Sequence, residues 1–159
     1  MPSNNPQAQA AVQRPVVILG AGQIGQAIAL KLQHAGGYTL LLADRNLASL
    51  QRMQALTSLP IAHVQDATAM EAAIAGRYAV LNALPFHQAV PVATLCARHG
   101  VHYFDLTEDV ASTHAIEALA RDARSVLMPQ CGLAPGFIGI VGNELAGRLD
   151  AAQSLRLRV

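Results

Sequence analysis

The chain has few charged and few aromatic residues, and these shortages exclude several classes of protein. Charged residues make up 13% of its 159 residues and aromatic residues 4%, and tryptophan is absent. Lys and Arg total 11 against 10 for Asp and Glu, so the basic excess typical of nucleic-acid-binding proteins is missing. Because hydrophobic residues make up 52% of the chain, we expect a folded domain and not a disordered segment.

Cysteines and long apolar runs are also scarce. Cys96 and Cys131, the two cysteines, lie far apart and form no CxxC pair, which argues against a disulfide scaffold or a zinc ribbon. No apolar run reaches the ~18 residues that a membrane-spanning helix needs. The N-terminus shows no leader of the secretory type. We therefore expect a cytoplasmic protein without a membrane segment or a nucleic-acid partner.

Short apolar runs alternate with helical patterns over most of the chain. The apolar runs predict strands at residues 15–19, 38–43, 61–64, 79–83, 101–105 and 125–128. Helical spacing predicts helices at about residues 24–35, 47–56, 69–75, 91–99 and 114–124, with Asn46 as the N-cap of the second and Gly36 and Gly100 ending the first and fourth. This alternation predicts an α/β fold, a doubly wound parallel sheet of about six strands.

The two ends of the chain depart from this pattern. Residues 1–13 carry no charge and no hydrophobic period, and we expect a flexible tail there. Near the other end, Pro135 suits the first position of a further helix that is apolar on more than one side. An apolar–polar alternation at residues 154–159 then predicts a half-buried strand. Residues 14–131 would thus form one domain, and residues 132–159 a crossover helix and the first strand of a second.

The pattern Gly20-x-Gly22-x-x-Gly25 is the strongest functional signal. It follows a buried strand and opens a helix, which is the context of a dinucleotide-binding turn. Gly20 allows the tight turn, Gly22 lets the backbone approach a pyrophosphate, and Gly25 permits close helix–strand packing. The amides of Gln23 and Ile24 would donate to that pyrophosphate. The motif indicates a Rossmann-type fold that binds a dinucleotide; a glycine-rich turn without a ligand is the alternative.

Acidic residues after the second and third predicted strands bear on the choice of cofactor. Asp44 follows the last glycine by about 20 residues, where a carboxylate can bind both ribose hydroxyls of NAD and repel the 2′-phosphate of NADP. Arg45 could pair with that phosphate or lie in solvent. The sequence therefore favours NAD without excluding NADP. Asp66 either contacts the adenine or caps the next helix.

The segment that ends the fourth predicted strand is expected to lie beside the cofactor. Open α/β sheets bind ligands outside the carboxyl ends of their strands. We therefore expect the segment to run along the cofactor towards the nicotinamide; its residues are Asn82, Ala83, Leu84 and Pro85. A plain turn stiffened by its proline is the alternative.

Acidic and histidine residues gather around the fifth predicted strand. They could hold a metal or transfer protons, and they are His102, Asp105, Glu108, Asp109 and His114. Residues 107–109 also fit the acidic capping of a following helix. We predict no metal site, and we name Asp105, Glu108 and His87 as candidate proton-transfer residues. Cys131 is expected to be an inert thiol.

Three segments together resemble the saccharopine dehydrogenase-like family, which includes saccharopine reductases and lysine 6-dehydrogenases. They are the run Val80-Leu81-Asn82-Ala83-Leu84-Pro85-Phe86-His87, residues 100–109 (GVHYFDLTED), and the loop Gly132-Leu133-Ala134-Pro135-Gly136. The resemblance covers about residues 15–149. It implies a two-domain NAD(P)-dependent enzyme, commonly a homodimer, that acts on C–N bonds of amino acids or polyamines. Its second, α+β domain would supply much of the substrate site.

One departure from the family narrows the resemblance. Saccharopine reductases carry aspartate where this chain has Ala134. In this loop the chain therefore resembles lysine 6-dehydrogenase-like members more than saccharopine reductases. The prediction for the full-length protein is an oxidoreductase acting on a small amine or amino-acid substrate, and we expect residues 1–159 alone to be inactive. A non-catalytic NAD-sensing domain is the alternative. Such a domain would use the same glycines and Asp44, but it would not need the loops at residues 82–85 and 133–136.

Overall fold

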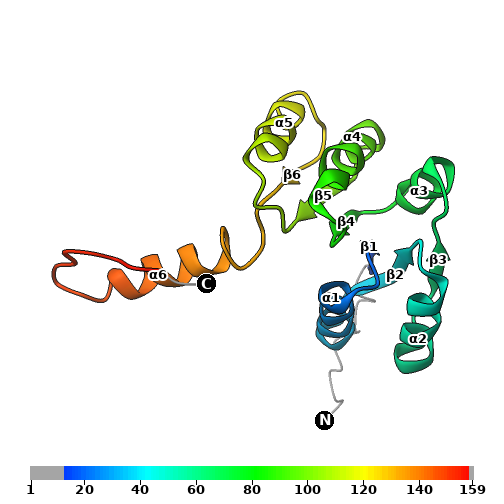
Figure 1. Ribbon diagram of the computed structural model, residues 1–159, viewed down its shortest axis with the longest axis horizontal. Coiled ribbons are helices and arrows are strands. Elements are labelled where there is room, and N and C mark those ends of the chain that lie inside the picture. The colour runs from blue at the N-terminus through cyan, green and yellow to red at the C-terminus, as the bar shows by residue number, and fades with distance from the viewer. Residues whose placement is uncertain (1–12, 158–159) are drawn as a thin grey trace, which may run out of the picture.

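The computed structural model describes residues 13–157 as a six-stranded parallel sheet between helices, with one further helix that extends away from it (Figure 1). The strands are β1 (Arg14–Leu19), β2 (Tyr38–Asp44), β3 (Ile61–His63), β4 (Ala79–Asn82), β5 (His102–Asp105) and β6 (Leu127–Met128). The helices are α1 (Gln23–Ala35), α2 (Leu47–Thr57), α3 (Ala67–Ile74), the 3-10 turn η1 (Phe86–Gln88), α4 (Ala89–His99), α5 (Val110–Ala120) and α6 (Phe137–Ala146). All but one residue of the predicted flexible tail, 1–13, lies outside the described residues.

Successive strands are added on one side of β1 up to β3 and on its other side from β4 onwards, and this reversal of strand order positions the site. The strand order is β3-β2-β1-β4-β5-β6, so β1 lies between β2 and β4. Leu19, the last residue of β1, pairs with Ala43 on one side and Asn82 on the other. In open α/β sheets such a reversal leaves a crevice outside the carboxyl ends of the two central strands. The predicted doubly wound parallel sheet is confirmed.

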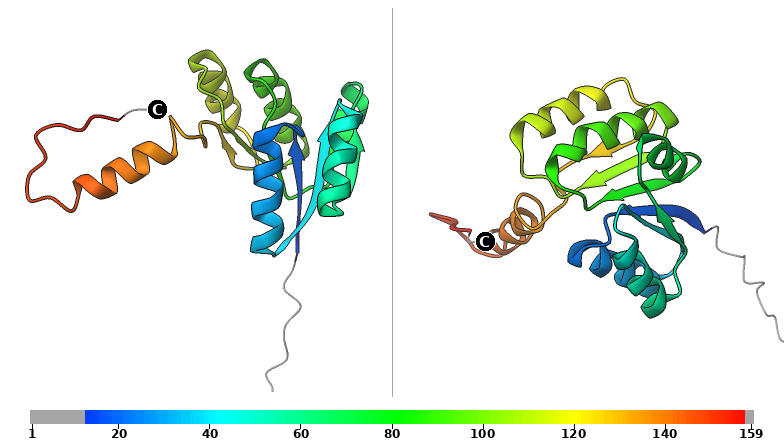
Figure 2. Two further views of the ribbon diagram at one scale, coloured as in Figure 1. Left: turned by 60° about the horizontal axis from the view of Figure 1, so that its bottom comes forward. Right: turned by 45° about the vertical axis from the view of Figure 1, so that its right-hand side comes forward.

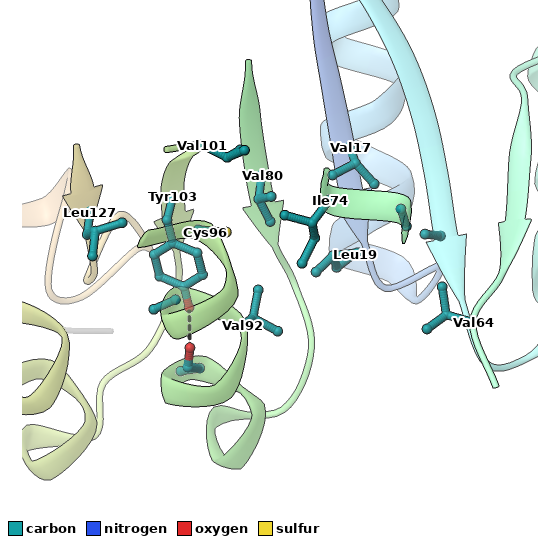
Figure 3. Packing of buried hydrophobic residues seen from close by; sticks show 14 of the residues in the cluster. Val17, Leu19, Val64, Ile74, Val80, Val92, Cys96, Val101, Tyr103 and Leu127 are labelled. Carbon is teal, nitrogen blue, oxygen red and sulfur yellow. Dashed lines mark hydrogen bonds between the residues drawn. The ribbon is translucent and has the colours of Figure 1, made fainter. Parts of the chain in front are cut away.

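Two apolar clusters hold the helices on the two faces of the sheet. Val17 and Leu19 belong to the cluster packed against α3, α4 and α5, part of which is shown in Figure 3. Val16 and Ile18 belong to the cluster against α1 and α2, which lie on the other face (Figure 2). Full burial of an aliphatic side chain contributes about 1.5–3 kcal/mol, so both faces stabilise the central strand. This explains why β1 is a continuous apolar run and not an alternating one.

Several helix ends lie where the sequence places them. The Asn46 side chain caps α2 by accepting a hydrogen bond from the Ser49 amide at 3.0 Å. Helices α1 and α4 end at Gly36 and Gly100, both with positive φ (71° and 65°). Glycine adopts this conformation without strain, so these two glycines end their helices as predicted.

Two predicted helix starts are wrong. The helix expected at residues 114–124 begins one turn earlier, because Asp109 caps it by accepting from the Ser112 amide at 2.7 Å. This confirms the capping interpretation of the acidic run before it. Pro135 precedes α6 and does not open it, because Gly136 has a φ of 127°, which no helical residue adopts.

The predicted strand at residues 154–159 is also wrong in its described part, which is irregular up to residue 157. Within residues 13–157 it has no neighbouring strand, and an isolated strand would leave its backbone groups unpaired. Leu155 and Leu157 instead lie against α6, where a Cβ on Gly142 would come within 2.9 Å of the Leu157 side chain. Helix α6 and this segment extend away from the sheet (Figure 2). Across the described residues, every helix is too short or too polar to cross a bilayer.

The two cysteines should react very differently with a thiol reagent. Cys96 is fully buried, and burial raises the pKa of its thiol to about 12. Cys131 is exposed and accessible to a reagent, although desolvation of its thiol and the nearby Asp105 carboxylate raise its pKa as well. Because the thiolate is the reactive form, we expect one equivalent of a disulfide reagent to react with the native protein at pH 8 and two after denaturation. Cys131→Ser should abolish labelling of the native state. Two rapidly labelled thiols in the native protein would contradict this packing of α4.

Candidate functional site

Polar side chains from three strands meet at the carboxyl edge of the sheet. Asp44 ends β2, Asn82 ends β4 and Asp105 ends β5, and strand register aligns Asn82 with Asp105. Two cavities open along this edge, with volumes of about 530 and 460 Å³. The larger lies between the glycine turn, the end of β2, the start of α3 and the first turns of α4. The smaller lies over the ends of β4 and β5.

The three glycines of the motif are required for different reasons. Gly20 has a φ of 104°, and a Cβ there would lie 2.9 Å from the carbonyl oxygen of Ala83. A Cβ on Gly25 would overlap the carbonyl oxygen of Gly20, so α1 can pack this close only through glycine. A Cβ on Gly22 would meet nothing within 4 Å. The protein itself therefore does not need glycine at position 22, and the open space fits a ligand that approaches the backbone.

The N-terminus of α1 is left without a cap where it borders the larger cavity. Its N-cap is Gly22, which offers no side-chain acceptor, and its first turn holds no acidic residue. Helices α2, α3 and α5 are capped by Asn46, Asp66 and Asp109. Helices α4 and α6 also lack a side-chain cap, but their first amides donate to carbonyl oxygens of the preceding turn or loop. The first amides of a helix have no partner within the helix, so those of α1 can donate to an anion. The expected role of the Gln23 and Ile24 amides stays a prediction; Ile24 lines the smaller cavity, and Gln23 is not among the lining residues of either cavity.

Asp44 already binds the glycine turn. One carboxylate oxygen accepts from the Ala21 amide at 2.5 Å and the other from the Asn46 amide at 2.7 Å. Each oxygen keeps a second lone pair, so the carboxylate can still accept from ribose hydroxyls at the cavity. Arg45 is exposed at the rim, and its carbonyl oxygen lies 2.9 Å from Nε2 of His63.

Asp66 is the N-cap of α3, one of the two roles that the sequence allowed. Its carboxylate accepts from the Ala69 amide at 2.8 Å and so caps α3. Its side chain also lines the larger cavity, so the cap does not remove it from the site. Ala83 and Leu84 line both cavities, and Pro85 lines the larger one. The segment after β4 therefore runs from one cavity to the other.

The three candidate proton-transfer residues differ in their burial, in the cavity that they line and in their hydrogen bonds. Asp105 is buried at the floor of the smaller cavity, where its carboxylate accepts three hydrogen bonds from the chain itself. Glu108 is exposed beside the same cavity and makes no side-chain hydrogen bond or ion pair within the described residues. His87 lines the larger cavity, with its ring edge-on to Phe86. Glu108 and His87 are thus the two candidates whose side chains make no hydrogen bond or ion pair within the described residues; Glu108 lines the smaller cavity and His87 the larger.

Two other members of the acidic and histidine group around β5 have structural roles. Hydrogen bonds from Ser112 hold the pKa of Asp109 below its usual range, so this cap stays ionised. His102 accepts a hydrogen bond on Nδ1 from the Val126 amide, at the opposite end of β5 from Asp105. Among residues 13–157, no group of three His, Cys, Asp or Glu side chains is arranged to hold a metal ion.

The loop after β6 is closed on itself and on β5. A Cβ on Gly136 would overlap the carbonyl oxygen of Gly132, which accepts from the Phe137 amide at 2.9 Å. The Cys131 amide donates to the carbonyl oxygen of Asp105 at 2.8 Å. The loop at residues 132–136 is therefore anchored next to the smaller cavity.

Sequence reasoning did not single out Tyr103. Its side chain is fully buried, and its hydroxyl contacts both Asn82 and Asp105. The available signal was strand alternation, which places Tyr103 and Asp105 on the same face of β5.

Comparisons with known proteins agree with this geometry. Residues 16–128 match the family model described as "Saccharopine dehydrogenase NADP binding domain". Saccharopine dehydrogenase (L-Glu forming) from Saccharomyces cerevisiae superposes with a TM-score of 0.76 at 18% identity, over 85% of this chain and 31% of that one. A putative myo-inositol dehydrogenase from Sinorhizobium meliloti 1021 superposes with a TM-score of 0.67 at 22% identity, over 87% of this chain and 43% of that one. GenD2 from gentamicin A biosynthesis, in complex with NAD, superposes with a TM-score of 0.67 at 18% identity, over 91% of this chain and 42% of that one.

These matches differ in what they establish. The solved structures share the fold, and this chain spans less than half the length of each. The family match covers most of the chain; it begins within β1 and includes β2 to β6, the glycine turn and the segment after β4. The resemblance stated from the sequence is confirmed: the chain belongs to the saccharopine dehydrogenase NADP-binding domain family.

Proposed function

We propose that this chain is the dinucleotide-binding part of an NAD(P)-dependent oxidoreductase that acts on C–N bonds of an amino-acid-like or polyamine substrate. The observation that carries the proposal is the uncapped start of α1, with open space at Gly22 facing a cavity of about 530 Å³. A helix N-terminus of this kind binds a pyrophosphate through its free amides.

The residues around the two cavities fit the parts of a dinucleotide. The amides of Gln23 and Ile24 would hold the pyrophosphate, and Asp44 the ribose of the adenosine half. Asp66 borders the space for the adenine. The segment at residues 82–85 leads towards the smaller cavity, where the nicotinamide would lie. The chemistry that a nicotinamide supplies when bound is hydride exchange at C4.

The charge around the smaller cavity favours an amine over an anionic substrate. Three acidic residues line it, namely Asp105, Glu108 and Asp109, and no basic residue is among its described lining. A carboxylate attracts an ammonium group and can move its proton. Glu108 is the residue proposed to exchange a proton with the substrate nitrogen, because the carboxylate of Asp105 is taken up by hydrogen bonds within the chain.

We further propose that the full-length protein has a second, α+β domain and is a homodimer. Its support is the apolar surface of α6, where Phe137 is 61% exposed, Ile140 73% and Leu145 55%. Exposed apolar patches of this kind mark interfaces. The share of each relative that this chain covers, 31–43%, is also consistent with a larger enzyme.

Valine at position 22 should abolish dinucleotide binding without unfolding the protein. A Cβ at Gly22 contacts nothing in the chain and its φ is −75°, so the added side chain enters only the space proposed for the ligand. Calorimetry with NAD⁺ should show at least a tenfold loss for Gly22→Val and an unchanged melting temperature. Gly139→Val is the matched control, because a Cβ on Gly139 also meets nothing within 4 Å. Equal NAD⁺ affinity in Gly22→Val and the unaltered protein would refute the placement.

NAD⁺ should bind more tightly than NADP⁺. Placing the 2′-phosphate beside the Asp44 carboxylate costs on the order of 1–3 kcal/mol, or ~5- to 150-fold in affinity. Competitive titration with both cofactors measures the ratio. Asp44→Asn should lower the preference for NAD⁺ over NADP⁺. Arg45→Ala should raise that preference if the exposed guanidinium binds the 2′-phosphate. Tighter binding of NADP⁺ by the unaltered protein would show that Arg45 overrides Asp44.

The full-length protein should oxidise an amine, while residues 1–159 alone should bind cofactor without turnover. Hydride transfer requires a substrate held at near-attack distance, and the resemblance assigns that task to the second domain. NADH formation with lysine, saccharopine and polyamines measures activity. Glu108→Gln should lower kcat by about 100-fold, whereas Glu117→Gln, on the exposed side of α5, should not. Cofactor binding without turnover of any amine by the full-length protein would favour the NAD-sensing alternative.

A further inference from the structure

A buried tyrosine connects the polar side chains at the carboxyl edge of the sheet. Tyr103 is fully buried, and Figure 3 shows its ring among apolar side chains with the hydroxyl directed towards α4. The hydroxyl lies 2.7 Å from Oδ2 of Asp105 and 3.2 Å from the carbonyl oxygen of Ala89. It has one proton, and the shorter contact to a carboxylate is the stronger bond. Nδ2 of Asn82 donates to the same hydroxyl at 3.0 Å.

The two partners of Tyr103 extend this contact to three separate loops. Oδ1 of Asn82 accepts from the Leu84 amide at 3.1 Å, in the loop after β4. Oδ1 of Asp105 accepts from the Thr107 amide at 3.0 Å, in the loop after β5. The same oxygen accepts from the Gln130 amide at 3.1 Å, in the loop after β6. One hydroxyl thus joins the backbones of three loops that are far apart in sequence.

This arrangement is costly unless every member has its partner. Burying a phenol and a carboxylate in an apolar core costs free energy that only complete hydrogen bonding offsets, and phenylalanine would fill the same space without that cost. Burial also raises the pKa of Tyr103, so the hydroxyl remains a donor at neutral pH. The smaller cavity is lined by Asn82, Leu84, Asp105 and Thr107, which are members of this network.

We infer that Tyr103 is a positioning residue of the nicotinamide end of the site. Through Asn82 and Asp105 it fixes the loops after β4, β5 and β6 in the spacing that a nicotinamide ring requires. The inference rests on the proposed dinucleotide binding, and it gives Asp105 a structural task in place of proton transfer. The adenosine half of the ligand would contact the glycine turn and Asp44, which lie outside this network; among the residues of the network, Leu84 alone also lines the larger cavity.

The test compares NAD⁺ with ADP-ribose, which lacks the nicotinamide. In Tyr103→Phe, calorimetry should show NAD⁺ binding about tenfold weaker and ADP-ribose binding changed by less than twofold. Tyr78→Phe is the matched control, because Tyr78 lies at the opposite end of the sheet, where its ring contacts Arg14 and His102. Hydrogen exchange should accelerate at the amides of Leu84, Thr107 and Gln130 in Tyr103→Phe, but not in β1 or β2.

The possible outcomes separate the inference from the proposed function. Unchanged NAD⁺ affinity in Tyr103→Phe, or equal losses for NAD⁺ and ADP-ribose, would overturn the positioning role. If Tyr103→Phe does not fold, Asn82→Ala, which removes one donor to the same hydroxyl, should accelerate hydrogen exchange at the Thr107 and Gln130 amides, which Asn82 does not itself contact; unchanged exchange there would overturn the positioning role. A failure of the unaltered protein to bind ADP-ribose would overturn the proposed function itself, and that result involves no variant.

Discussion

The contact between the glycine turn and the start of α1 is the constraint on which the rest of the site depends. Because Gly25 has no side chain, α1 begins directly against the carbonyl of Gly20. The helix can then start at the end of β1 and lie flat on the sheet, with Ala29 fully buried. Its first turn therefore lies at the crevice created by the reversal of strand order between β1 and β4. A bulkier residue at position 25 would displace both the helix and the crevice.

The fold was predictable because its determinants are local. Each strand is an apolar run bounded by turn residues. Several helices begin or end at a residue whose role follows from its chemistry, such as the capping side chain of Asn46 or the positive φ of Gly100. The errors arose where local signals compete. An alternating apolar pattern at residues 154–157 suits a strand, but a strand needs a neighbour, and here the leucines pack against α6 instead. Asp109 fits both a site residue and a cap, and only the three-dimensional structure shows the cap.

The candidate site was predictable only where its residues have a fixed spacing in the sequence. The glycine turn and Asp44 have fixed spacing in sequence, so their proximity could be expected. The function of Asp105 could not, because its partners come from Tyr103, the loop after β5 and the loop after β6. A carboxylate at a strand end looks the same in sequence whether its oxygens face a ligand or the chain's own donors. Glu108, three residues later, retains its free oxygens because it lies on the exposed side of the loop.

The hydrogen bond from Ala21 to Asp44 has a consequence for the kinetics of ligand capture. It holds the tip of the glycine turn to the end of β2 through groups of the chain itself. A loop that is ordered during folding loses its conformational entropy then, and the encounter with a ligand does not have to order it again. For the proposed dinucleotide, the turn would be a preformed receptor, so that diffusion and desolvation, not a rearrangement of the backbone, would set the rate at which this end of the site fills.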